Sequence, residues 1–171
     1  ELRREYDLEL SDIDRIELDA PTKAVTQNDM DGTVSVMAAQ YSAQFNVAAA
    51  LIADPSDPAT YRPERISDPA IAALQAKVVS IQAAEEFDAT YAWKMGGRVR
   101  IYLEDGETLS QTVHGQKGSM HDPLDSRELA AKFDGLTVGR SDSALGGLLS
   151  SIIDAETLND LTGVLRRVDL S

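Results

Sequence analysis

Residues 98–114 read RVRIYLEDGETLSQTVH, and this stretch decides the fold. Val99, Ile101 and Leu103 alternate with polar or amphipathic residues, which is the period of a half-buried strand. The pair Asp105-Gly106 stands in the middle and is typical of a type I′ turn, whose two central residues both need positive φ. The stretch therefore predicts a β-hairpin.

Two further strands are expected. Residues 13–20 read IDRIELDA, in which Ile16 and Leu18 alternate with charged residues. The acids of this segment are expected on a solvated strand face, because charged residues seldom become buried. Residues 78–82 read VVSIQ and form the remaining predicted strand.

Helical spacing of apolar residues predicts helices at residues 36–53, 69–78, 125–133, 143–153 and from 154 onward. The first is rich in alanine and is expected to be long, central and buried. Ser67 or Asp68 can cap the second, and Asp125 can cap the third. Residues 22–35 are polar and are expected to form a loop.

These elements predict an α+β fold: a small antiparallel sheet with packed helices, followed by C-terminal helices. Residues 1–12 are expected to be the end of an upstream helical region or a linker, residues 13–137 the α+β domain, and residues 138–171 the C-terminal helices. Apolar side chains at helical spacing in the last segment predict a surface that self-associates or binds a partner. They are Leu145, Leu148, Leu149, Ile152 and Leu161.

Composition excludes several classes of function. The 171 residues are 43% hydrophobic and 26% charged, which is typical of a folded domain. The net charge of −13 argues against nucleic-acid binding, which needs clustered positive charge. Cysteine is absent, so disulfides and thiolate metal sites are excluded. No apolar run is long enough to span a membrane and no signal peptide is visible, so we expect a cytoplasmic protein without membrane contact.

Two basic segments are candidate binding sites in this acidic chain. Arg98 and Arg100 share one strand face, which is either solvated or a surface that binds carboxylates through guanidinium groups. Lys117 and Gly118 lie in the segment HGQKGS, which is either a plain turn or a loop whose backbone approaches a substrate. Its spacing is not that of a P-loop.

No catalytic set is complete among these residues, because the sequence has no GxSxG, HExxH or dinucleotide-binding pattern. His114 and His121, with Asp122, match no trusted zinc spacing, so no metal is expected. Tyr41 and Ser42 can donate hydrogen bonds but are expected to be packing residues.

Several segments in order resemble the MmgE/PrpD family, which includes 2-methylcitrate dehydratase, cis-aconitate decarboxylase and iminodisuccinate epimerase. The segments are AQYSAQFNVAAAL at 39–51, SDPAIAALQAKV at 67–78, the turn at 105–106, and GSMHDPLDSRELAAKF at 118–133. Order and spacing agree over residues 13–165. The chain departs from the family at Gln40, where many members have lysine, and lacks an obvious match for a tyrosine around Ala24 and Val25.

The resemblance implies that this chain is the C-terminal portion of a longer enzyme. Residues 13–137 would form its lid domain, the last helices would return to a large helical domain, and the acid and base residues would lie mainly upstream of Glu1. The family acts on di- and tricarboxylates without cofactor or metal, by removing a proton or carbon dioxide next to a carboxylate, and a homodimer is expected. The substrate-binding candidates are Lys117, Gly118, Gln40, Tyr41, Arg98 and Arg100.

Two readings of function follow. The first is the lid part of a lyase or isomerase of this family, with the isolated chain inactive. The second is a binding or assembly domain that keeps the lid fold without catalysis. The ordered motifs favour the first reading, and the incomplete catalytic set favours the second.

Overall fold

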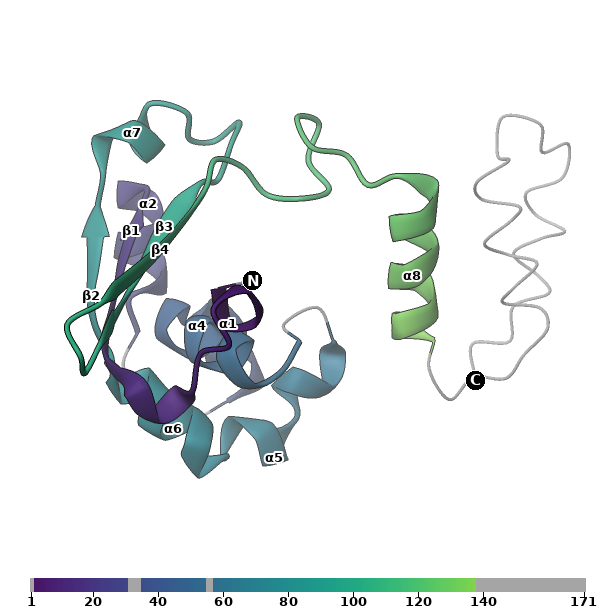
Figure 1. Ribbon diagram of the computed structural model, residues 1–171. Coiled ribbons are helices and arrows are strands. Elements are labelled where there is room, and N and C mark those ends of the chain that lie inside the picture. The colour runs from purple at the N-terminus through teal and green to yellow at the C-terminus, as the bar shows by residue number, and fades with distance from the viewer. Residues whose placement is uncertain (1, 31–34, 55–56, 138–171) are drawn as a thin grey trace, which may run out of the picture. The chain divides into compact units, whose positions relative to one another are not determined.

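A computed structural model describes residues 2–30, 35–54 and 57–137 of the chain (Figure 1). The chain divides into two compact units, Glu1–Pro123 and Leu124–Ser171. The first unit holds a four-stranded sheet and its helices, and the second begins with one described helix. The predicted helices of residues 138–171, with their apolar side chains, lie outside the described residues.

The sheet has the strand order β2-β1-β3-β4. Its strands are β1 (Ile13–Ala20), β2 (Val78–Ala83), β3 (Gly97–Leu103) and β4 (Thr108–Val113). β3 pairs antiparallel with both β1 and β4, whereas β2 runs parallel to β1. The α+β class is confirmed, but the sheet is mixed rather than antiparallel. The helices between β1 and β2 form a long crossover, which lets the chain return and run in the same direction.

The helices are α1 (Leu2–Glu5), α2 (Thr22–Asn28), α3 (Val36–Tyr41), α4 (Ala43–Ile52), α5 (Pro63–Ile66), α6 (Pro69–Ala76), α7 (Glu85–Asp88) and α8 (Ser126–Leu136). Two 3-10 turns, η1 (Leu10–Asp12) and η2 (Pro58–Tyr61), complete the described elements. α1, α4 and α6 lie on one side of the sheet (Figure 1). None of the helices in the described ranges is both long and apolar enough to cross a membrane.

The core lies between one face of the sheet and these helices. The strands contribute Ile16, Leu18 and Ile101, and α4 contributes the fully buried Phe45. The pairing of β1 with β3 contains a β-bulge: Ile13 is opposite Leu103 and Arg15 is opposite Tyr102, so β1 has one extra residue between these two pairs. This bulge lets Ile13 join Ile16 in the core although the two do not alternate.

The predicted helix over residues 36–53 is in fact two helices. Ser42 has extended backbone angles (φ −77°, ψ 119°) and stands between α3 and α4. Its Oγ accepts a hydrogen bond from the backbone N–H of Phe45 at 3.1 Å, so it caps the second helix. The prediction of one helix was wrong because alanine-rich periodicity continues through a capping serine without a visible break.

The predicted loop at residues 22–35 contains α2. Pro21 precedes this helix and provides no side-chain cap. Asp88, from α7, instead accepts hydrogen bonds from the Thr22 Oγ1–H at 2.6 Å and the Thr22 backbone N–H at 2.7 Å. These bonds lower the pKa of Asp88. The helix was missed because its cap comes from a residue far away in the sequence.

The predicted hairpin is confirmed, but its turn differs from type I′. Leu103 donates its N–H to the Glu107 carbonyl at 2.9 Å and accepts from the Gly106 N–H at 3.0 Å. Three residues therefore form the loop, and Gly106 adopts a φ of +91°. Asp105 is not among the described residues with positive φ, which a type I′ turn would require.

Both predicted helix caps are confirmed. Asp68 accepts from the Ala70 N–H and precedes Pro69 at the start of α6. Asp125 accepts from the Glu128 N–H at 2.7 Å, and the Glu128 carboxylate accepts from the Asp125 N–H at 2.9 Å. This reciprocal pair is a capping box at the start of α8.

Candidate functional site

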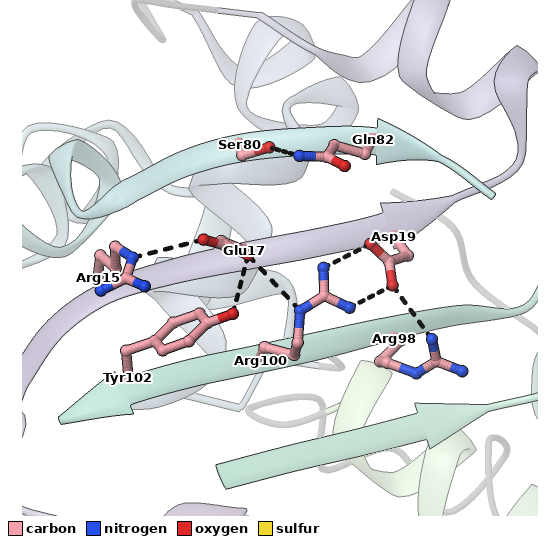
Figure 2. A network of polar contacts seen from close by, with 8 residues as sticks. All are labelled: Arg15, Glu17, Asp19, Ser80, Gln82, Arg98, Arg100 and Tyr102. Atoms are coloured by element: carbon pink, nitrogen blue, oxygen red, sulfur yellow. Dashed lines mark hydrogen bonds and ion pairs between the residues drawn. The ribbon is translucent and has the colours of Figure 1, made fainter. Parts of the chain in front are cut away.

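The face of β1 and β3 that points away from the core carries a network of charged side chains (Figure 2). Arg100 donates through Nη1 to Asp19 Oδ2 at 2.5 Å and through Nη2 to Asp19 Oδ1 at 2.7 Å. Arg98 contacts the same Asp19 Oδ2 at 3.2 Å and pairs with Glu86 at 2.6 Å. Arg98 and Arg100 therefore converge on one carboxylate.

Glu17 holds the other half of this network. Its carboxylate accepts from the Tyr102 hydroxyl at 3.0 Å and from Arg15 Nε at 3.4 Å. Arg100 Nε lies 3.6 Å from Glu17 Oε2. The Arg15 guanidinium also lies 3.7 Å from the centre of the Tyr102 ring, in cation–π contact.

Asp19 contradicts the expectation that the acids of this strand are solvated. It is 8% exposed, and the pKa of Asp19 lies below its usual range because Arg100 hydrogen bonds to the carboxylate, an effect that burial opposes. The same hydrogen bond raises the pKa of Arg100. Burial is tolerated because the charge is paired on both oxygens.

The sequence left two interpretations of Arg98 and Arg100 open, a solvated strand face or a surface that binds carboxylates. Their guanidinium groups bind carboxylates, as the second reading supposed, but these belong to the protein itself: Glu17, Asp19 and Glu86. The structure thus supplies both arginines with internal counter-charges.

The loop of Lys117 and Gly118 is held by its own contacts. Lys117 Nζ lies 3.0 Å from Asp122 Oδ1, with the two side chains 46% and 54% exposed. Gly118 has a φ of +86°, and its N–H donates to the Asp122 carbonyl at 2.7 Å. The glycine is required here because side chains disfavour that backbone region.

A second loop lies against this one. The Met95 N–H donates to the Gln116 side-chain carbonyl at 2.8 Å, and a Cβ built on Gly115 would stand 3.7 Å from the Lys94 stem. Beside these contacts is a pocket of about 360 Å³. It is lined by Ala89, Thr90, Trp93, Lys94, Met120 and His121. We call it the loop pocket.

The loop pocket combines apolar and cationic groups. Trp93 and Met120 are 73% and 78% exposed, so apolar surface faces solvent. Among the residues that the structure describes, no carboxylate forms an ion pair with Lys94. An unpaired ammonium beside an indole is suited to a small organic anion, whose charge and apolar part both find a partner.

The predicted candidates occupy three different places. Gln40 and Tyr41 are exposed at the end of α3, where the Tyr41 carbonyl accepts from Asn28 Nδ2 at 2.7 Å. Arg98 and Arg100 lie on β3, and Lys117 and Gly118 on the loop after β4. Trp93 was missed, although it is the only tryptophan of the chain. Within the described ranges, no group of three or more acids and histidines is placed to hold a metal ion.

Comparison with known families decides the relationship of this chain. A family model, the MmgE/PrpD C-terminal domain, matches residues 1–145. The chain belongs to the MmgE/PrpD family. No match was found among curated proteins.

The matched residues 1–145 include all four described strands of the sheet and both loops that line the loop pocket. They also include α8, in the second unit. The suspected family and the C-terminal position of the match within it are therefore confirmed.

Proposed function

We propose that this chain is the C-terminal, lid part of an enzyme that acts on a small di- or tricarboxylate. The reaction begins with removal of a proton next to a carboxylate and leads to dehydration, decarboxylation or epimerisation, without a cofactor. The observation that carries the proposal is the family match over residues 1–145. The rest of the enzyme, a helical domain, supplies the base and closes the substrate cleft.

The chemistry assigns a specific task to cations. Loss of a proton beside a carboxylate places further negative charge on an anion, and positioned cations stabilise that charge. The chain carries a net charge of −13 and repels a polycarboxylate at long range, so the site needs local positive charge.

Lys94 and Lys117 support this role better than the arginines. Arg98 and Arg100 are already neutralised by buried or half-buried carboxylates. Lys117 pairs with Asp122 on an exposed loop, and Lys94 lines the loop pocket. We therefore propose that the two loops bind a substrate carboxylate, with Lys94 and Lys117 as the contacting cations.

Kinetics of the full-length enzyme test the proposal. A charge-assisted hydrogen bond contributes about 1.5–3 kcal/mol, so Lys94→Ala and Lys117→Ala should each lower kcat/KM by roughly ten- to a hundred-fold. Lys23→Ala, an exposed lysine on α2, is the matched control and should leave kcat/KM unchanged. If both loop variants stay within twofold of the wild type while Arg98→Ala does not, the anion site is the strand face.

A second experiment separates the enzyme from a binding module. The purified 171-residue chain should show no turnover in dehydratase, decarboxylase or epimerase assays, because the base lies elsewhere. The same assays on the full-length protein should show turnover. A full-length protein that is folded but inactive on all three would favour the binding or assembly reading.

A further inference from the structure

Among the residues that the structure describes, β4 is an edge strand of the sheet. It pairs with β3 on one side only, since the strand order is β2-β1-β3-β4. Leu103 and Glu107 form a hydrogen-bonded pair beside the turn. Hydrogen-bonded pairs occur at every second residue of an antiparallel ladder, so the next residues of β4 that hydrogen bond to β3 are Leu109, Gln111 and Val113. The backbone N–H and C=O groups of Thr108, Ser110 and Thr112 therefore point outward. Within the described ranges, no hydrogen bond satisfies these six groups.

Nothing in β4 protects this edge. Natural sheets protect exposed edges with charged residues, proline or bulges, because an open edge pairs readily with another strand. β4 reads TLSQTV and has no charge and no proline. Its pairing with β3 runs without a register shift. In a chain with a net charge of −13, this uncharged edge lets a second copy approach without facing a charged side chain of the strand itself.

The outward positions are also symmetric. Threonine, serine and threonine follow one another at 108, 110 and 112, so the pattern reads the same in both directions about Ser110. Two antiparallel copies of β4 can therefore place Ser110 opposite Ser110, and Thr108 opposite Thr112. Hydroxyl side chains then meet hydroxyl side chains, a stabilising cross-strand combination.

We propose that β4 pairs with β4 of a second copy of this chain across a two-fold axis at Ser110. The two four-stranded sheets become one continuous sheet. Each of the three hydrogen-bonded pairs exchanges two bonds, so about six backbone hydrogen bonds join the copies. The interface is isologous, since the same strand serves both partners. The charged network beside it needs no partner, because Arg98 and Arg100 are paired with carboxylates of their own chain.

Single-cysteine variants test the register, because the chain contains no cysteine. In the proposed pairing the two Ser110 Cα atoms lie about 5.5 Å apart, within the range of a disulfide. Ser110→Cys should therefore form a covalent dimer on mild oxidation of the 171-residue chain. Thr108→Cys should not, because the two positions are offset by about 13 Å along the strands. The double variant Thr108→Cys, Thr112→Cys should cross-link.

Ser80→Cys is the matched control on β2, the other edge strand. It should stay monomeric on the same gel. A dimer that cross-links through position 80 and not through position 110 would overturn the proposal. So would equal cross-linking at 108 and 110, which would indicate collisions without a defined register.

Sedimentation equilibrium gives a test without cysteine. The Ser110 N–H points away from β3, so Ser110→Pro leaves the hairpin bonds intact and removes two bonds between the copies. The dimer Kd should rise at least tenfold, with an unchanged circular dichroism spectrum. Ser110→Thr keeps the N–H and should leave the Kd unchanged. A wild-type chain that is monomeric throughout, or a dimer insensitive to Ser110→Pro, would refute the pairing.

Discussion

Arg100 forms a bidentate hydrogen-bonded ion pair with Asp19 on the neighbouring strand, with N–O distances of 2.5 and 2.7 Å. The two residues are 81 positions apart in the sequence. Asp19 is buried and Arg98 contacts one of the same oxygens, so the carboxylate is surrounded by positive charge. This contact ties β1 to β3 on the polar face, opposite the apolar core.

Asp19→Asn should destabilise the fold. The substitution removes the negative charge that two half-buried guanidinium groups share. Arg98 keeps Glu86 and Arg100 keeps Glu17, but each loses its contact with the most buried carboxylate of the network, and removing one partner of a buried ion pair is costly. We expect a loss of about 2 kcal/mol in the free energy of unfolding, measured by urea titration. Asp14→Asn is the control, since its ion pair with Arg15 is exposed to solvent and should contribute much less to stability. Equal losses in the two variants would contradict this account.

The contribution of Asp19 to the free energy of unfolding should depend on pH. The pKa of Asp19 is lower in the folded chain than its ordinary value of 3.8, so the folded state binds fewer protons there than the unfolded state. The stabilisation is thus fully present above about pH 5 and is lost as the pH falls below 3.8 through the folded pKa. The stability difference between wild type and Asp19→Asn should be constant at neutral pH and shrink in acid. A difference that is unchanged at pH 2 would argue against it.

Gly96→Ala should disturb the junction between the two loops and the sheet. A Cβ at this position would stand 2.8 Å from the Val113 carbonyl oxygen and 2.9 Å from Phe87 Cδ1. Neither atom moves freely, because one is backbone and the other belongs to a buried ring. We expect a loss of about 1–3 kcal/mol in thermal or urea unfolding. Gly115→Ala meets only ordinary contacts at 3.7 Å, so it should change stability by less than about 0.5 kcal/mol.

Ser42→Ala should cost more than an ordinary cap. Ser42 Oγ is fully buried and accepts from the Phe45 N–H, and it lies 3.2 Å from both the Met30 carbonyl and Gln44 Oε1. Loss of this cap should lower the free energy of unfolding by about 1–2 kcal/mol. Ser35→Ala removes the exposed cap of α3 and should cost about 0.5 kcal/mol. The account fails if the exposed cap proves the more costly one.

Local patterns in the sequence were sufficient where a segment's partners are near in the chain. The hairpin followed from alternation before an Asp-Gly turn, and the starts of α6 and α8 followed from caps within a few residues of the helix. The family was also readable, because its motifs are short segments in a fixed order. Among the site residues, sequence placed Arg98 and Arg100 on one strand face, as the structure shows.

The sequence alone therefore determined the residue chemistry and the hydrophobic periodicity of each segment. Only the tertiary structure decided which segments contact one another. The cap of α2 comes from Asp88, 66 residues after Thr22. The direction of β2 depends on the crossover that precedes it, and the burial of Asp19 depends on two arginines from another strand. Trp93 and Lys94 line the loop pocket with Met120 and His121 because two distant loops meet at one place. These features arise from contacts between residues far apart in the chain, which no local period encodes.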